Sequence, residues 1–181
     1  MAIDMTEGDP TKAILKFSYP LLIGNLFQQL YNIVDSVIVG RFIGKDALAS
    51  VGSSFMLMNF FSYVIIGLCI GSSAVYSCFF GEKNYSSLRK SIFISFFSIG
   101  LFTIMLSVGT VLNIENMLKL MQTPESIFKG SEEYLKIIFG GLIFIFLFNA
   151  CSALLRSIGD SKTPLYFLIL AAIINIILDL V

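Results

Sequence analysis

The sequence predicts an all-α polytopic membrane protein with about five transmembrane helices, and both its composition and its hydropathy pattern carry that prediction. Of the 181 residues, 56% are apolar and 13% are charged, whereas a soluble domain has about 25% charged residues. The mean hydropathy is +0.88, and the apolar residues gather in long runs. Because hydrocarbon offers the backbone no hydrogen-bond partners, each run is expected to be a helix.

The apolar runs come close to the ~20 residues that cross ~30 Å of hydrocarbon at ~1.5 Å per residue. We place the membrane part in residues 13–181 and treat residues 1–12 as an N-terminal segment in the cytoplasm. The five expected spans are Ala13–Val39, Met56–Phe80, Ile92–Leu112, Tyr134–Leu155 and Leu165–Val181.

Local signals place several helix ends. The first helix should begin at Asp9-Pro10, a capping residue followed by proline at the first helical position. Pro20 lies inside that helix and should kink it. Residues Ala47–Phe55 should extend the second helix beyond the membrane, with Asp46 near its start.

The linker between the third and fourth spans, Asn113–Glu133, contains its own helical pattern. We expect a short amphipathic helix at the membrane interface, because apolar and polar residues alternate there at helical spacing. Thr123-Pro124-Glu125 should break it, and Ser131-Glu132-Glu133 should cap the fourth span. The apolar face of the short helix holds Ile114, Met117, Leu118 and Met121, and its polar face holds Glu115, Asn116, Lys119 and Gln122.

Lysine and arginine in the loops predict the orientation, because these residues are enriched on the cytoplasmic side. With the N-terminus inside, the inner segments hold seven basic residues and the outer segments hold five. The bias favours a cytoplasmic N-terminus. The seven are Lys12, Lys16, Lys83, Arg89, Lys90, Arg156 and Lys162, and the five are Arg41, Lys45, Lys119, Lys129 and Lys136.

Composition also excludes several classes of function. The formal net charge is zero, which argues against nucleic acid as a partner, and the chain has no histidine. Histidine is the usual general base and the commonest metal ligand, so we expect no enzyme active site and no cofactor. We expect Cys69, Cys78 and Cys151 to be buried free thiols, since all three fall in apolar runs without metal-type spacing. Gly67 and Gly71 form a GxxxG pattern that should allow close helix packing.

One face of the first span is polar. At about 100° per residue, its polar side chains fall within ~120° of one another, while the rest of the surface is apolar. A stripe of amides ending in a carboxylate predicts one wall of an aqueous cavity. The alternative is that the amides tie helices together. The stripe consists of Asn25, Gln28, Gln29, Asn32 and Asp35.

The fifth span carries a matching pair, Asn175 and Asp179, four residues apart and hence on one face. An unpaired carboxylate at bilayer depth costs about 2.5–3.5 kcal/mol. Asp179 should therefore be protonated, bind a cation or reach water, unless it lies among headgroups at the helix end. Asp35 and Asp179 each lie ~22 Å beyond a proline, Pro20 or the one at 164. Opposed carboxylates at matched depth would suit a proton or a sodium ion.

Four stretches of the chain resemble multidrug and toxic compound extrusion (MATE) transporters in order and spacing. They are KFSYPLLIGNLFQQLYNIVDSVIVGRFIGKDALASVG, GEKNYSSLRKS, TPESIFKGSEEYLKI and LLRSIGDSKTPLYFLILAAIINIILDLV. The resemblance covers essentially the whole chain.

The resemblance implies twelve spans in two lobes, exporting amphipathic organic compounds across the plasma membrane against inward proton or sodium flow. It implies a cation site at Asp35, Asn175 and Asp179, and it matches Pro20 to a proline whose bending accompanies cation binding. This chain would supply the N-lobe, with membrane lipid and the remainder of the same transporter as its partners. Its bare apolar ending leads us to expect a sixth span and a second lobe beyond residue 181.

Two other functions compete with export. A flippase of lipid-linked saccharides, from the same superfamily, would be expected to place arginines inside its cavity, and no basic residue lies deep in these spans. A non-transporting scaffold would be expected to lack paired intramembrane acids, contrary to Asp35 and Asp179.

Overall fold

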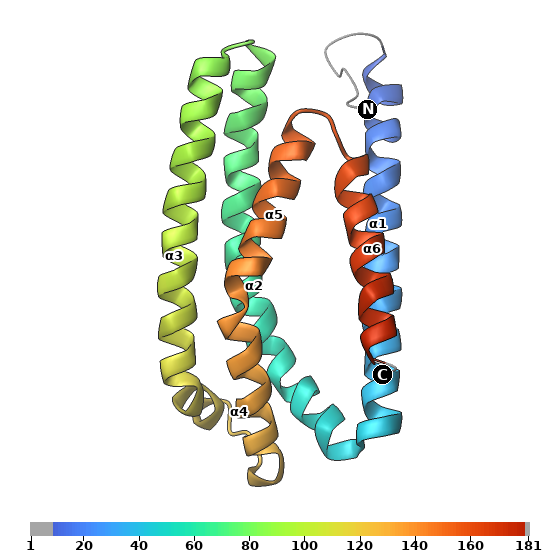
Figure 1. Ribbon diagram of the computed structural model, residues 1–181, viewed down its shortest axis with the longest axis vertical. Helices are drawn as coiled ribbons and strands as arrows, with labels where there is room; N and C mark the ends of the chain where they lie inside the picture. Colours follow the sequence, from blue (N-terminus) through green and yellow to red (C-terminus); the bar gives the residue numbers. More distant parts are fainter. Residues whose placement is uncertain (1–8, 180–181) are drawn as a thin grey trace. The chain divides into compact units, whose positions relative to one another are not determined.

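The computed structural model describes residues 9–179, except for the side chains at positions 10, 43 and 179, and this part of the chain is helical without strands (Figure 1). Within the described residues every expected span is helical, apart from a break at Gly141 in the fourth. The elements are α1 (Pro10–Ile38), the π-helix η1 (Val39–Ile43), α2 (Lys45–Gly81), α3 (Tyr85–Leu120), α4 (Glu125–Gly140), α5 (Leu142–Ser157) and α6 (Lys162–Asp179).

The helices belong to two compact units, which are described separately below. Unit 1 comprises Met1–Ile38, Ser72–Ile92 and Cys151–Val181, and thus α1, α6 and the turn between α2 and α3. Unit 2 comprises Val39–Gly71 and Phe93–Ala150, and thus the long parts of α2 and α3 together with α4 and most of α5.

Length and composition qualify α2 and α3 as membrane-crossing helices, and α4 with α5 makes a third span if that bent pair crosses as one. The chain is therefore a polytopic α-helical membrane protein. In α6, residues Lys162–Leu178 are apolar but shorter than the length required, and α1 does not qualify. A crossing by α1 or α6 stays a prediction.

The start of α1 confirms the predicted cap, because the backbone N–H of Thr11 donates to Asp9 Oδ1 at 2.9 Å. The helix runs without interruption past Pro20 as far as Ile38, so the predicted kink stays untested. The π-helix that follows was not predicted.

The π-helix ends at Gly44, whose N–H donates to the carbonyl of Val39 at 3.2 Å. Gly44 has a φ of 115°, a backbone conformation that residues other than glycine rarely adopt. Helix α2 then begins at Lys45, which confirms the predicted extension with Asp46 in its first turn.

The prediction of a separate interfacial helix after the third span is wrong, because residues 113–120 continue α3. Their amphipathic pattern is nonetheless confirmed: Ile114 and Leu118 are buried, while Glu115 and Lys119 are exposed. The predicted break is also confirmed, since α3 ends at Leu120 and α4 begins at Glu125.

Two expectations for the fourth span are wrong. Ser131 caps no helix, because α4 already begins at Glu125 and Ser131 is buried inside it. The span is also not one straight helix, since α4 and α5 meet at Gly141 with a bend of 44°. Beside this bend, the Ser107 hydroxyl of α3 donates to the carbonyl of Phe139 at 2.6 Å.

Aromatic side chains pack α4 and α5 against α2 and α3 in unit 2. Phe139 meets Phe61 edge-on with ring centroids 5.3 Å apart, and Phe146 meets Phe96 at 6.0 Å. Gly100 makes room for this contact, because a Cβ at its position would lie 3.3 Å from the ring of Phe146. Such pairs contribute about 0.5–1.5 kcal/mol beyond area burial.

Serines join α2 to α4 near the start of both helices. The hydroxyls of Ser53 and Ser131 lie 2.9 Å apart, and Ser131 also donates to the carbonyl of Ser50 at 3.3 Å. Ser50 donates to the carbonyls of Asp46 at 2.8 Å and, less closely, of a residue in α4. The close approach depends on Gly130, where a Cβ would lie 2.7 Å from Ser50 Oγ.

Two expectations about small residues are wrong or unmet. Cys69 is buried as expected, but Cys78 and Cys151 are exposed, and all three are free thiols. A Cβ built at Gly67 or Gly71 would meet no atom within 4 Å, so the GxxxG face makes no close helix contact in the described part of the chain.

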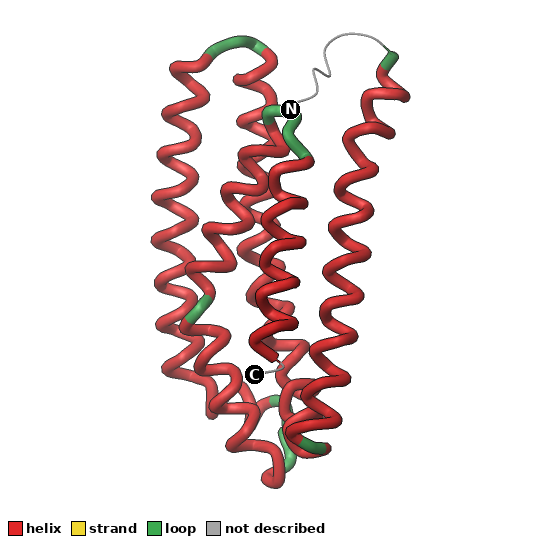
Figure 2. The backbone as a smooth tube through the Cα atoms, turned by 45° about the vertical axis from the view of Figure 1, so that its right-hand side comes forward, coloured by secondary structure: helices red, strands yellow, loops and turns green. Residues whose placement is uncertain are grey.

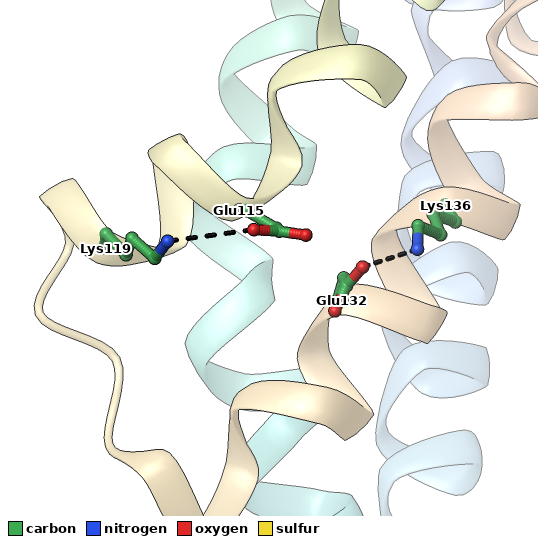
Figure 3. Close-up of polar contacts among 4 residues, drawn as sticks. All are labelled: Glu115, Lys119, Glu132 and Lys136. Atoms are coloured by element: carbon green, nitrogen blue, oxygen red, sulfur yellow. Dashed lines mark hydrogen bonds and ion pairs between the residues drawn. The ribbon is translucent and has the colours of Figure 1, made fainter.

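Charges in unit 2 are paired along helices. Figure 3 shows Lys119 bound to Glu115 at the end of α3, at 3.7 Å, and Lys136 bound to Glu132 on α4. In each pair the two residues lie one turn apart on the same helix, and the pair stabilises that helix by about 0.2–0.5 kcal/mol.

Candidate functional site

The candidate site lies within unit 1, where α1 and α6 pack directly on each other. Both helices start at the same end of the unit and run the same way (Figures 1 and 2). Gly24 of α1 is buried at the contact, where a Cβ would lie 3.4 Å from Leu165 and 3.4 Å from Leu168. These distances correspond to ordinary van der Waals contact, so Gly24 marks where the two helices touch.

This contact sets the relative depth of the two acidic positions. Gly24 precedes Asp35 by the same number of residues by which Leu168 precedes position 179. Parallel helices rise by the same ~1.5 Å per residue, so positions 35 and 179 lie at one level to within about a turn. The packing supports the matched depth that the two prolines suggested.

Asn175 occupies the α1-facing side of α6. At about 100° per residue it lies within ~20° of Leu168, which contacts Gly24. The side chain is half-buried, and its Oδ1 is fully buried with no hydrogen-bond donor in the described part of the chain. An unpaired buried acceptor costs about 1–3 kcal/mol, and a hard cation or a donor entering this position would remove that cost.

Asp35 lies at the edge of the polar stripe nearest α6. It is separated by about 20° around α1 from Gly24, and it is half-buried and has an interaction partner. The backbone of Asp179 belongs to α6, and its position shares the face of Asn175 by helical periodicity. The side chain of Asp179 lies outside the described residues.

The remaining amides of the stripe are exposed rather than packed between helices. Asn32 donates to Gln29 Oε1 at 3.3 Å, a bond within α1 itself. In the part of the chain that the structure describes, no hydrogen bond from these amides reaches another helix. The exposed residues are Asn25, Gln28, Gln29 and Asn32.

Pro20 is buried in α1, one turn before Gly24. The described side chains, which do not include that of Asp179, contain no group of three or more His, Cys, Asp or Glu able to bind a metal ion. Sequence reasoning missed Gly24, although its place on the same face as Pro20, one turn later, was a usable signal.

Comparison with known proteins finds relatives of this chain in both sequence and fold. The MatE family model matches residues 20–181. Probable multidrug resistance protein YoeA of Bacillus subtilis is 36% identical over 90% of this chain and 35% of that protein, and YpnP of the same organism is 33% identical over 98% and 40%. A solved structure described as MATE in the bent conformation has a TM-score of 0.86, with 26% identity over 95% of this chain and 38% of that one. The chain thus spans 35–40% of the length of these curated relatives.

Proposed function

The chain belongs to the MatE family, and from this premise we propose that it supplies the first lobe of a cation-coupled exporter of amphipathic organic compounds. The names of YoeA and YpnP as probable multidrug resistance proteins support export of drugs. The proposal includes a plasma-membrane location with the N-terminus in the cytoplasm, for which the excess of basic residues in the inner segments is the support.

The observation that carries the coupling site is the buried Oδ1 of Asn175, which has no donor among the described side chains and lies on the face of α6 that meets α1. Asp35 lies on the neighbouring helix, and position 179 lies one turn beyond Asn175 at the level of Asp35. A proton or a sodium ion would neutralise carboxylate charge in a weakly solvated place, where an unpaired charge is costly. Asn175 would add an oxygen ligand of the kind that hard cations prefer.

Export requires that cation binding change the conformation. A ligand shifts an equilibrium only by its differential affinity for two states. Pro20 removes one backbone hydrogen bond within α1 and clashes with the preceding turn, so it is the natural place for that helix to bend. The relative solved in a bent conformation shares this fold. Binding between α1 and α6 would then favour one curvature of α1 over another.

The exposed amides of α1 would form one wall of the substrate cavity, which the remainder of the transporter would complete. Amides offer donors and acceptors without a fixed charge. They can therefore bind varied amphipathic compounds, whereas an arginine-lined cavity would select anions. This difference favours export of drugs over flipping of lipid-linked saccharides.

The test uses the full-length transporter in cells that lack other efflux pumps, with ethidium as the exported dye. Asp35→Asn and Asp179→Asn should each reduce efflux to the background rate without lowering the abundance of the protein. Asp46→Asn is the matched control, because this carboxylate lies in the first turn of α2 in unit 2 and should leave efflux unchanged. Wild-type efflux by both site variants would refute the coupling site.

Orientation is tested by accessibility of single cysteines in intact cells, on a background without the three native thiols. Ser126→Cys should react with a membrane-impermeant maleimide added outside, and Ser86→Cys should react only after the cells are opened. Labelling of Ser86→Cys from outside would reverse the orientation.

A further inference from the structure

Unit 1 collects basic residues at one of its ends. The start of α1, the turn between α2 and α3, and the turn between α5 and α6 all lie at this end (Figures 1 and 2). The last two are joined by the Ser77 hydroxyl, which donates to the carbonyl of Ser157 at 3.4 Å. We call the group the basic end; it consists of Lys12, Lys16, Lys83, Arg89, Lys90, Arg156 and Lys162.

The basic end carries a positive excess within the described residues. Its three acidic residues are Asp9, Glu82 and Asp160. Two of these carboxylates cap helices: Asp9 accepts from the Thr11 N–H, and Asp160 accepts from the N–H groups of Lys162 and Thr163. Apart from Arg156, which has an interaction partner, none of the lysines and arginines of the basic end forms an ion pair with a described side chain.

Unit 2 shows that this excess is not a general property of the chain. Its charged residues are five basic and five acidic, and two of the basic ones are paired one turn from an acid. Six of the seven basic side chains in unit 1 are instead exposed, and Arg156 is half-buried.

Exposed tyrosines accompany the basic residues on three helices that are distant in sequence. Tyr19 follows Lys16 on α1, Tyr85 follows Lys83 at the start of α3, and Tyr166 follows Lys162 on α6, each within about one turn. Their exposed fractions are 67%, 55% and 67%. Tyrosine prefers the headgroup level of a membrane, and lysine or arginine just beyond it reaches the phosphates.

We propose that the basic end of unit 1 is a docking surface for anionic phospholipid headgroups, of the phosphatidylglycerol type. On α1 and α6 the order of basic residue, tyrosine and apolar helix fits the phosphate, glycerol and acyl levels of a lipid leaflet, and on α3 the basic residues Lys83 and Arg89 lie on both sides of Tyr85 within about one turn. A free anion would use the positive charge but not the tyrosines, which is why the lipid is the favoured occupant. This inference does not depend on the cation site or on transport.

The experiment measures lipid association with the full chain reconstituted in phosphatidylcholine bilayers. Spin-labelled phosphatidylglycerol and spin-labelled phosphatidylcholine are added separately, and electron paramagnetic resonance gives the fraction of each that is immobilised by the protein. The wild-type chain should prefer phosphatidylglycerol by about fivefold or more, because each basic side chain near an anionic surface adds about that factor. The preference should shrink as salt is raised.

Two triple variants separate the basic end from net charge. Lys83→Asn/Arg89→Gln/Lys90→Gln should remove most of the preference, and asparagine tolerates the left-handed backbone of position 83, where φ is 56°. Lys119→Gln/Lys129→Gln/Lys136→Gln removes the same charge from unit 2 and should leave the preference unchanged. Helix content by circular dichroism checks that both variants fold.

Three outcomes would overturn the proposal. The first is equal immobilisation of the two lipids by the wild-type chain. The second is an equal loss of preference in both triple variants, which would indicate net charge alone. The third is displacement of phosphatidylglycerol by inorganic phosphate beyond the effect of sodium chloride at matched ionic strength, which would indicate a site for the free anion.

Discussion

Units 1 and 2 treat their buried polar groups in opposite ways. In unit 2, five buried hydroxyl side chains each donate to a backbone carbonyl. Two of its lysines also form ion pairs with glutamates. In unit 1, two buried polar atoms lack any partner in the described part of the chain, Asn175 Oδ1 and Ser161 Oγ. Its basic side chains other than Arg156 also form no ion pair there.

The difference separates packing from function. A satisfied hydroxyl stabilises the helix contact in which it lies, since the net value of such a bond is about 0.5–1.5 kcal/mol. An unsatisfied amide oxygen destabilises the fold unless something enters to bind it, and such groups gather where proteins bind ligands. Removing polar groups should therefore affect stability differently in the two units.

The largest effect should come from filling the closest approach in unit 2. Gly130→Ala would place a Cβ 2.7 Å from Ser50 Oγ and 3.4 Å from its Cβ. The serines that join α2 to α4 must then move, and overpacking of this kind costs about 1–3 kcal/mol. Thermal unfolding of the detergent-solubilised chain, followed by circular dichroism, measures the loss.

Gly109→Ala is the control for this prediction. It lies within α3 in unit 2, where an added Cβ would meet nothing within 4 Å, so alanine should stabilise the helix by about 0.5–1 kcal/mol. If both variants shift the unfolding temperature upward, the serine contact contributes nothing to the packing of α2 on α4.

The next effect should come from the bend between α4 and α5. Ser107→Ala removes the hydroxyl that donates to the carbonyl of Phe139 at 2.6 Å, and the loss of such a hydrogen bond costs about 0.5–1.5 kcal/mol. We expect a loss near the middle of that range in the same unfolding assay. Ser107→Thr keeps a hydroxyl and should recover most of it. An unchanged unfolding temperature for Ser107→Ala would contradict the role given to this bond.

A smaller effect should come from the cap of α6 in unit 1. Asp160→Ala removes bonds from the Lys162 and Thr163 N–H groups and from the Thr163 hydroxyl, the last at 2.7 Å. Loss of such a cap costs about 1 kcal/mol. Asp160→Asn should retain most of the stability, since asparagine is an equally good capping residue.

The same cap predicts a pH dependence. Hydrogen bonds from Thr163 lower the pKa of the Asp160 carboxyl from its ordinary value of 3.8. A lowered pKa means that the ionised cap stabilises the fold fully above the ordinary pKa and loses this contribution as the pH falls through the lower value. The difference between wild type and Asp160→Ala should therefore be constant from neutral pH to about pH 5 and narrow only in stronger acid. A gap that closes between pH 7 and pH 5 would be inconsistent with this cap.

The smallest change in stability should follow removal of the unpartnered amide. Asn175→Leu replaces a buried acceptor without a donor by an apolar side chain of similar size, which is neutral or stabilising by up to about 1 kcal/mol. In the full-length transporter the same change should abolish cation-coupled efflux. A strongly destabilised Asn175→Leu would show that the amide is paired in the folded protein, and the contrast between the two units would then fail.

Much of the fold was predictable because apolar runs and capping residues act locally. The Asp9 cap, the start of α2 beside Asp46 and the buried face of Ile114 and Leu118 all follow from residues a few positions apart. The bend at Gly141 was missed because a long apolar run hides a break. Only the glycine pair at 140 and 141 marked it.

Features that depend on distant residues were not predictable. Ser131 looked like a cap, and only the packing of α4 against Ser50 and Ser53 gives it a different role. The polar stripe of α1 was readable from its periodicity. That Asn175 Oδ1 has no donor could not be known before the neighbours of α6 were placed. The prediction that Cys78 and Cys151 are buried was wrong for the same reason, since an apolar run does not show which side of its helix faces a neighbour.

The modest hydropathy of α1 bears on how the chain is made. Among the described helices, α1 is synthesised before α2 and α3, although its amides and its carboxylate make it a poorer insertion signal than either. Its packing partner α6 begins only at Lys162, after all the other helices have left the ribosome. We expect α1 to wait at the insertion machinery, or to enter only provisionally, until α6 arrives and the Gly24 contact can form. The two helices that would bind the cation are thus also the first and the last to be assembled among those described here.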